Sequence, residues 1–318
     1  MRAPITLSLH LPNFNYPDTP PERLFEKVVE IAGAAEDSGF SSVTVMDHLH
    51  QIPPVGPRTN YMLEGNTILA GIAARTSTIT VGLLVGGVTY RNPALMAKIT
   101  TTLDIISGGR AILGLGAAWF EEEHDAYGFD FPRLGVRFEH LRDALHIARL
   151  MFTEEEPSYE GKHHSISNIL NNPRPLRGDI PIMIGGSGEK KTLRLVAEYG
   201  DACNVFSNDV GQFTHLMGVL QGHCDDVGRD FSEITKTTMR RIVIGDTEDA
   251  ARAKLDAARV PEQMRPMFVA GSPDQVAEHV QELVDAGVEG LTIGMVDVHD
   301  LDAVRQVGET LGPLLNRS

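Results

Sequence analysis

The sequence predicts an α/β protein in which strands and helices alternate and close into a (β/α)8 barrel with insertions. Apolar strands separated by amphipathic helices recur along the chain, and eight such strands can be recognised. The strand residues from Ala111 onwards are apolar on both faces, as in a parallel sheet covered by helices. The length of 318 residues suits one barrel of this kind. We therefore expect residues 1–318 to form a single domain with an insertion at about 157–180.

The first half of the chain supplies four strand-helix units. The predicted strands are residues 5–9, 42–46, 79–87 and 110–116. Helices are expected to begin near Thr19, Glu64, Asn92 and Val136. Asn92 followed by Pro93 is typical of a helix start, because asparagine caps the first turn and proline fits the first helical position.

The second half resumes the alternation after an insertion. Residues 158–166 predict a small hairpin that turns at Glu160 and Gly161. The remaining predicted strands are residues 181–185, 201–206, 237–244 and 290–295. Helices are expected from Glu189 through Leu193, around Phe213, and over 275–286. A closed barrel suits eight strands better than an open doubly wound sheet does.

Composition limits the possible partners. Lys and Arg number 28 against 43 Asp and Glu, a net charge of -15, which argues against nucleic-acid or anionic membrane surfaces. Cys203 and Cys224 lack metal-site spacing and fit a reducing compartment. The N-terminus does not resemble a secretory signal, and the longest apolar run is too short to span a bilayer. We expect a cytoplasmic protein with a small-molecule substrate.

Candidate site residues are those at the carboxyl ends of strands, where barrels of this kind build their active sites. Asp47 and His48 follow the second strand and place a proton-transfer group beside a carboxylate. Trp119 and Glu122 follow the fourth strand. Residues 185–188, Gly-Gly-Ser-Gly, follow the fifth strand and open a helix, where backbone N–H groups and Ser187 suit a phosphate.

The sequence of the fourth strand also suggests that a flat ligand binds at its end. Gly114 and Gly116 remove side chains, so that a ligand could lie against bare backbone, with Trp119 as a rigid wall. Simpler interpretations stand beside these. Trp119 could be a core residue, Asp47 a turn cap, and Glu121 and Glu123 merely charges that complement a helix dipole.

A metal-dependent hydrolase is a different class of function. His48 and His50 are spaced like a metal-binding pair at a strand end, but no matching histidines follow strands five and six. His163 and His164 lie in the insertion and are expected at the surface. We therefore expect no metal site.

Taken together, the motifs resemble the luciferase-like monooxygenase superfamily, and within it the branch that uses the deazaflavin coenzyme F420. The resembling segments follow one another in the right order over nearly the whole chain. They are residues 46–49 (MDHL), 88–93 (VTYRNP), 114–119 (GLGAAW) with Glu122, Glu123 and 126–128 (AYG), 184–188 (IGGSG) and 197–201 (AEYGD). The resemblance implies a bacterial luciferase-like (β/α)8 TIM barrel.

The resemblance also implies roles. Asp47 and His48 would sit over the deazaflavin, with His48 assisting proton transfer during hydride transfer, and a non-prolyl cis peptide within residues 84–86 would support the ring. The catalytic set implied is His48, Asp47 and Trp119. The cofactor-binding set implied is Asp47, Leu84, Val85, Gly86, Ala117, Ala118, Glu122, Gly185, Gly186, Ser187 and Gly188.

Two departures bear on the substrate. Sugar-phosphate dehydrogenases of this branch carry a glutamate where this chain has Trp119 and a lysine where it has Asp209. Both differences favour an uncharged or hydrophobic organic substrate. The expected activity is an F420-dependent oxidoreductase, and relatives suggest a homodimer. A monooxygenase using reduced FMN and oxygen is the nearest alternative, and a non-catalytic flavin-binding relative is another.

Overall fold

A closed barrel of parallel strands forms the centre of the computed structural model, which describes residues 5–207 and 209–316. The barrel strands are β1 (Leu7–Leu11), β2 (Ser42–Val45), β3 (Thr80–Leu83), β5 (Ala111–Gly116), β8 (Ile182–Gly185), β9 (Ala202–Val205), β10 (Thr235–Ile244) and β12 (Gly290–Gly294). Each pairs in parallel with its neighbour, and β10 closes the ring by pairing with both β9 and β12. The predicted (β/α)8 TIM barrel is confirmed.

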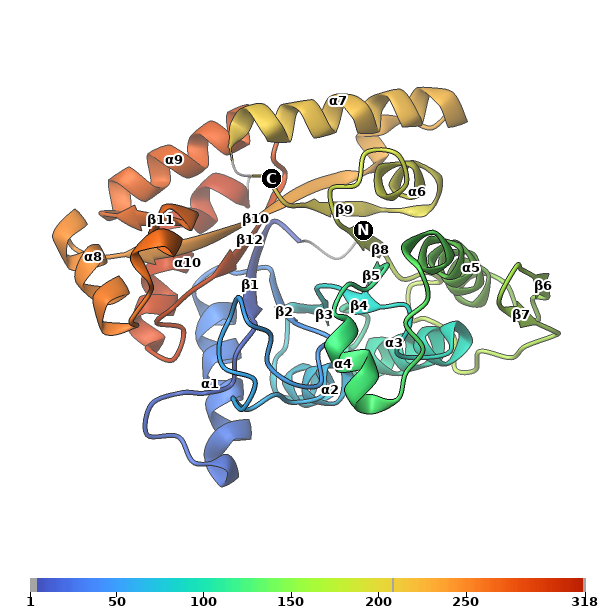
Figure 1. Cartoon of the computed structure of the whole chain (residues 1–318), viewed down its shortest axis with the longest axis horizontal. Helices are drawn as coiled ribbons and strands as arrows, with labels where there is room; N and C mark the ends of the chain where they lie inside the picture. Colours follow the sequence, from blue (N-terminus) through green and yellow to red (C-terminus); the bar gives the residue numbers. More distant parts are fainter. Residues whose placement is uncertain (1–4, 208, 317–318) are drawn as a thin grey trace.

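Helices surround the barrel (Figure 1). They are α1 (Leu24–Asp37), α2 (Gly65–Arg75), α3 (Pro93–Ser107), α5 (Leu134–Thr153), α6 (Thr192–Tyr199), α7 (Val210–Val227), α9 (Pro273–Asp285) and α10 (Leu301–Leu315). Asn92 caps α3 by accepting hydrogen bonds from the N–H groups of Ala94 and Leu95, as its sequence predicts. The helix expected from Glu189 begins three residues later, at Thr192. No helix of the described residues is long and apolar enough to cross a membrane.

Alternation along each strand divides the barrel into two environments. Leu7 and Leu9 of β1 face the helices and join the main core, whereas Ser8 and His10 face the barrel axis. Apolar side chains from several strands form a second cluster inside the barrel: Ile112, Met183 and Ala202, with Ile5 and Leu84 packed against them. The carboxyl-terminal part of the interior is lined by polar and small residues instead, so the interior becomes polar towards its mouth.

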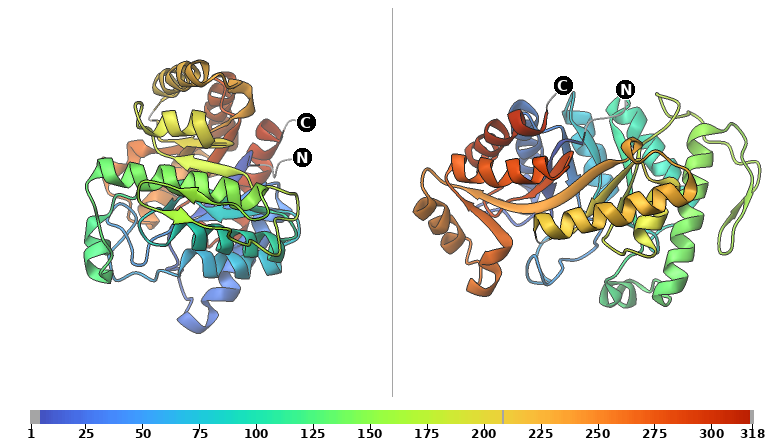
Figure 2. Two further views of the ribbon diagram at one scale, coloured as in Figure 1. Left: turned by 90° about the vertical axis from the view of Figure 1, so that its right-hand side faces the viewer. Right: turned by 90° about the horizontal axis from the view of Figure 1, so that it is seen from above.

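The insertion forms the expected hairpin at one edge of the molecule. Strands β6 (Tyr159–Glu160) and β7 (Ser165–Ile166) pair antiparallel, and residues 161–164 make the turn, which is longer than the two-residue turn predicted at Glu160 and Gly161. Asp143 of α5 holds this turn, because its carboxylate accepts hydrogen bonds from the N–H groups of His163 and His164 at 2.7 and 3.0 Å. Figure 2 shows the hairpin at the opposite end of the molecule from α8.

A second extension was not anticipated from the sequence. β10 is ten residues long and runs past the barrel, so that Arg241–Ile244 pair with the short strand β11 (Phe268–Gly271). Between these strands lie α8 (Glu248–Ala257) and the 3-10 helix Glu262–Met267. The extension raises one wall of the barrel above its carboxyl-terminal mouth.

Candidate active site

The buried carboxylate of Glu123 organises one side of the mouth. It lies in α4 (Glu121–Tyr127), where its side chain is fully buried. It accepts hydrogen bonds from the Nδ1 of His48 at 2.9 Å, from the N–H groups of Leu49 and His50 at 2.5 and 2.9 Å, and from the hydroxyl of Tyr90. The interpretation of Glu123 as a solvated charge in a first helical turn is therefore wrong.

The same contacts keep Glu123 ionised. Burial opposes ionisation, but the hydrogen bonds from His48, Tyr90 and two backbone N–H groups outweigh it and lower the pKa of Glu123 to about 2. Because Glu123 occupies Nδ1 of His48, the imidazole is oriented and its Nε2 is left for other partners. A histidine held in this way is equipped to exchange a proton at Nε2.

Helical spacing could have revealed Glu123. Phe120, Glu123 and Tyr127 are separated by three and four residues and share one helical face. All three contact the segment after β2: the ring of Phe120 lies 5.9 Å from that of His48, and the Tyr127 hydroxyl donates to the carbonyl of Leu49 at 3.2 Å. The two flanking aromatic residues mark the buried member of the three glutamates.

Asp47 forms a second buried ionic group behind His48. Its Oδ2 accepts hydrogen bonds from the N–H of Gly87 at 3.0 Å and from Arg91 at 2.8 Å, and Arg91 also pairs with Glu64 at 2.6 Å. Burial raises the pKa of Asp47, and the opposing effect of Arg91 does not cancel this rise. Its Oδ1 is buried without a hydrogen-bond partner among the described residues. Asp47 thus ties the end of β2 to the loop after β3.

Val85 fills the space beside three glycines at the end of the barrel. The peptide bond between Leu84 and Val85 is cis, at the position that the resemblance implied. A Cβ on Gly116 would lie 2.9 Å from Val85, and one on Gly185 would lie 2.8 Å from it, while a Cβ on Gly114 would collide with the carbonyl of Leu83. The idea that Gly114 and Gly116 leave bare backbone for a flat ligand is therefore wrong, because β3 and the residues after it occupy that space.

The residues after β5 reach the rim. The indole of Trp119 is about half exposed and its ring centre lies 5.7 Å from that of His48, so it belongs to the mouth rather than the core. Ala118 has a φ of 57° and lies against Gly87, where a Cβ would be 3.5 Å from its own. Ala117 packs at the edge of the main core. Glu122 is exposed on α4 and pairs with Arg58 at 3.2 Å.

The loop after β8 lies across the mouth from His48. Gly186 has a φ of 123°, and its N–H donates to the carbonyl of Asn204 at 2.9 Å. The Ser187 hydroxyl donates to the carbonyl of Phe206 and accepts from its N–H, at 2.9 and 2.8 Å. This hydroxyl therefore ties the loop to the end of β9. A Cβ on Gly188 would lie 2.8 Å from the Thr192 hydroxyl, so glycine is required where the loop meets α6.

A polar layer beneath the mouth was not recognised in the sequence. His10 is buried, and its Nδ1 lies 3.0 Å from the Thr44 hydroxyl. Burial, opposed by Thr44 and assisted by nearby His48, lowers the pKa of His10 to about 4, so it is neutral at pH 7. Across the barrel, Asn204 donates to the Thr237 hydroxyl at 2.8 Å. These residues alternate with apolar ones in their strands, which was the signal available.

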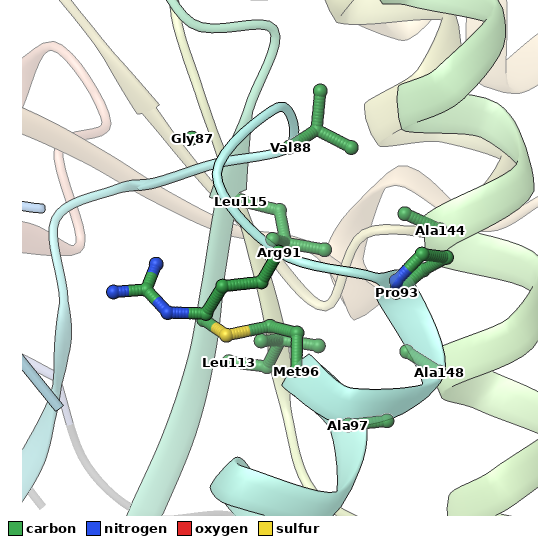
Figure 3. Close-up of a pocket in the computed structure, with 10 residues that line it drawn as sticks. All are labelled: Gly87, Val88, Arg91, Pro93, Met96, Ala97, Leu113, Leu115, Ala144 and Ala148. Atoms are coloured by element: carbon green, nitrogen blue, oxygen red, sulfur yellow. The ribbon is translucent and has the colours of Figure 1, made fainter. Parts of the chain in front are cut away.

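Two hollows adjoin this region from outside the barrel. The first is an apolar cavity of about 10 Å³ between β5, α3 and α5, which is too small for a substrate. Figure 3 shows Met96, Ala97 and Ala148 around it, with the Arg91 guanidinium pointing away. The second is an open groove of about 510 Å³ that includes Tyr90 and Arg91 in its lining. Glu64 and Arg91 of the Asp47 network line this groove, whereas His48 and Trp119 do not.

Comparison with known proteins agrees with this geometry. The sequence model of the luciferase-like monooxygenase family matches residues 5–263. The chain belongs to this family. Its members are oxidoreductases and monooxygenases, and the chain is accordingly an enzyme.

Relatives in the luciferase-like family include both a dehydrogenase and a monooxygenase. The F420-dependent glucose-6-phosphate dehydrogenase of Segniliparus rotundus is 28% identical over 294 residues, which cover 83% of this chain and 86% of that protein. The pyrimidine monooxygenase RutA of Stutzerimonas stutzeri is 28% identical over 236 residues, covering 72% of this chain and 64% of that protein. The family therefore leaves the finer activity open.

A solved structure confirms the fold at low sequence identity. The coenzyme F420-dependent tetrahydromethanopterin reductase from Methanopyrus kandleri superimposes with a TM-score of 0.79 at 21% identity, covering 98% of this chain and 99% of that chain. Similarity at this level concerns the barrel alone. The two proteins therefore share the barrel fold over nearly the whole of both chains.

Proposed function

We propose that this protein is an F420-dependent oxidoreductase that transfers a hydride between the deazaflavin and a small organic substrate, with His48 as proton donor or acceptor. The observation that carries the proposal is the contact between His48 Nδ1 and the buried, ionised Glu123. This contact orients an imidazole at the mouth of the barrel, 5.7 Å from the indole of Trp119. A neutral polar interior lies below it.

The residues at the mouth fit a planar, phosphorylated cofactor. Gly186 has a φ of 123°, and Gly188 allows the loop 185–188 to approach Thr192 of α6 closely, so the loop brings its backbone to the start of that helix, where a phosphate would bind. Asp47 Oδ1 offers a buried acceptor that lacks a partner among the described residues. We therefore assign cofactor contacts to Asp47, to residues 84–86, to Ala117, Ala118 and Glu122, and to residues 185–188.

Each side chain then has one task. When bound, the deazaflavin supplies or accepts the hydride at the reacting carbon of the substrate. His48 Nε2 would give one proton to the substrate oxygen when the hydride, which carries both electrons, reaches the substrate carbon, and would take that proton back in the oxidation. Glu123 holds His48 in position, and Trp119 gives the apolar part of the substrate a wall. Val85 packs against Gly114, Gly116 and Gly185, which together form a glycine socket, and supports the floor of the mouth from there.

An FMN-dependent monooxygenase is the second candidate, because a pyrimidine monooxygenase is among the relatives with 28% identity. A metal-dependent hydrolase has less support, since no three His, Cys, Asp or Glu side chains within residues 5–207 and 209–316 are grouped to hold a metal ion. Titration of the purified protein with F420 and with FMN under identical conditions, followed by absorbance, separates the two cofactors. Tighter binding of FMN would favour the monooxygenase.

Replacement of His48 tests the proton-transfer role. His48→Ala should bind the cofactor within about threefold of the native affinity but lose about 10²- to 10⁴-fold in kcat, the usual contribution of a general acid or base. Stopped-flow measurement of F420 oxidation and reduction checks this. Native turnover by His48→Ala would exclude His48 as the proton carrier.

A further inference from the structure

Arg241 is a cation without a counter-charge at the mouth of the barrel. Its guanidinium lies 5.6 Å from the centre of the Phe268 ring and 3.6 Å from the Met267 sulfur. No carboxylate in residues 5–207 or 209–316 forms an ion pair with Arg241. Burial lowers the pKa of its guanidinium, and no neighbouring charge opposes this effect. A half-buried arginine with apolar neighbours is costly unless an anion joins it.

Strand register places Arg241 at the level of His10. Arg241 pairs with Gly294 of β12, and Gly294 pairs with His10 of β1. A Cβ on Gly294 would lie 3.4 Å from the Met239 methyl group and 3.8 Å from Arg241 Cγ. Because Gly294 alternates with outward-facing Ile293, this Cβ direction points towards the barrel axis, and so Met239 and Arg241 line the interior side of the mouth.

The distance from the proposed proton carrier suits a small molecule. Three strand spacings of about 4.8 Å separate β10 from β2, which is about 15 Å along the wall. A small molecule with its anionic end at Arg241 would lie within this interval, with its reacting carbon towards His48.

The cations that suit a cofactor phosphate stand elsewhere on the rim. Lys190 and Lys191 follow the glycine loop of β8, where Lys191 lies 5.4 Å from the ring centre of Phe138. Arg241 stands on β10, on the far side of β9. In a chain with a net charge of -15, an anionic substrate needs such a local donor.

We propose that Arg241 binds the carboxylate of the substrate, which is therefore a small oxo or hydroxy acid with an apolar body. This inference rests on the proposed function and refines it, because it replaces the expected uncharged substrate with an anionic one. Arginine suits the role, since its planar guanidinium donates two parallel hydrogen bonds to one carboxylate. The side chains of Trp119, Phe206 and Met267 are exposed and apolar, and we assign to them the contacts with the body of such a molecule.

The single tryptophan makes binding measurable without turnover. Trp119 is the only tryptophan in the chain and lies at the mouth, so its fluorescence reports occupancy directly. The probes are α-ketoisocaproate and methyl isobutyl ketone, which differ only by a carboxylate in place of a methyl group. We would titrate both into the native protein, Arg241→Met, Arg241→Lys and the control Arg252→Met. Arg252 is an exposed residue of α8 paired with Glu248, so Arg252→Met removes the same single positive charge as Arg241→Met does.

The native protein should bind the oxo acid at least about tenfold more tightly than the ketone, as expected for a charge-assisted hydrogen bond. Arg241→Met should abolish this preference by weakening only the acid, Arg241→Lys should keep part of it, and Arg252→Met should keep all of it. Equal acid affinities in the native protein and Arg241→Met would overturn the proposal. So would an Arg241→Met protein that binds F420 tenfold more weakly while it keeps its preference for the acid.

The outcome is separable from that of the proposed function. A preference for the carboxylate that depends on Arg241 supports the anion site. If reduced F420 then fails to reduce α-ketoisocaproate, the result counts against the F420 activity with this substrate class. Circular dichroism and thermal unfolding of each variant verify that the fold is retained. A variant that fails to fold is replaced by Arg241→Gln, which keeps hydrogen-bond donors but removes the charge.

Discussion

The two sides of the barrel mouth are built in opposite ways. On the side of β2, β3 and β5, the carboxylates of Asp47 and Glu123 are buried and accept six hydrogen bonds between them. On the side of β8, β9 and β10, the wall consists of a glycine loop, the exposed ring of Phe206, and the unpaired guanidinium of Arg241. On the first side the protein satisfies most of the polar groups, apart from Asp47 Oδ1, whereas on the second side the charge of Arg241 has no partner within the described residues.

This difference indicates a division of labour. A buried, hydrogen-bonded network fixes the geometry of His48 before any ligand arrives, as a proton-transfer group requires. Glycine backbone, exposed apolar surface and an unpaired cation gain partners only when ligands bind. Changes on the first side should therefore act on kcat, and changes on the second side should act on affinity.

The largest effect is expected from Glu123→Gln. The amide retains the size of the side chain but loses the charge that orients His48 and the acceptor capacity that serves two backbone N–H groups. We expect kcat to fall by about 10²-fold or more, with cofactor affinity within about threefold of native. Steady-state kinetics and cofactor titration measure both. Glu121→Gln is the matched control, because it removes an exposed charge from the same helical turn, and it should behave as native.

Acid should weaken the network side of the mouth. The pKa of Glu123 is lowered from 4.5 to about 2 in the folded state, so its contribution to stability is complete above pH 4.5 and is lost as the pH falls towards 2. The loss amounts to up to about 3 kcal/mol in the free energy of unfolding, at 1.4 kcal/mol per pKa unit. Urea unfolding at a series of pH values should show this slope in native protein and a shallower one in Glu123→Gln. Parallel slopes would contradict the assignment.

The socket between the two sides should tolerate no added methyl group. Gly185→Ala would bring a Cβ within 2.8 Å of Val85, and such overpacking typically costs about 1–3 kcal/mol in unfolding free energy. Combining it with Val85→Ala should recover part of the loss. Gly218→Ala on α7, where nothing lies within 4 Å of the new Cβ, is the control and should stabilise by about 1 kcal/mol. Equal effects at the two glycines would show that the socket is not close-packed.

The smallest effect concerns the loop on the ligand side. Ser187→Ala removes two hydrogen bonds to the backbone of Phe206, which are worth about 1 kcal/mol each at most. We expect cofactor affinity to fall by about fivefold to tenfold, while kcat at saturating cofactor stays native. Titration and saturation kinetics distinguish these quantities. A loss in kcat with unchanged affinity would contradict the division between the two sides.

The barrel could be predicted from the sequence because its signals are local. Apolar runs ended by glycine or by a capping residue mark each strand and helix, and the Asn92 cap, for example, is formed as predicted. The strand predicted over residues 42–46 is one residue longer than the observed β2. Position at the carboxyl ends of strands also predicted that Asp47, His48, Trp119 and residues 185–188 lie at the same end of the barrel.

The site network could not be predicted in the same way, because it depends on contacts distant in sequence. Glu123 is one of three consecutive glutamates, and only its 2.9 Å contact with His48, 75 residues away, distinguishes it. The role of Gly116 becomes visible only when Val85 is seen against it. The strand predicted over residues 237–244 contains the extended end of β10, but α8 and β11 were not predicted, because α8 is polar and β11 is a short strand, most of whose residues are only half-buried.

That extension has a consequence for how the enzyme can diversify. β11 pairs with Arg241–Ile244 at the end of β10, and only Arg241 of these residues also takes part in the pairing with β12 that closes the ring. Insertions or sequence changes there leave ring closure untouched while they reshape the surroundings of Arg241. A combinatorial library restricted to residues 262–271 should therefore yield folded enzymes with altered substrate choice at a higher rate than one restricted to residues 84–91.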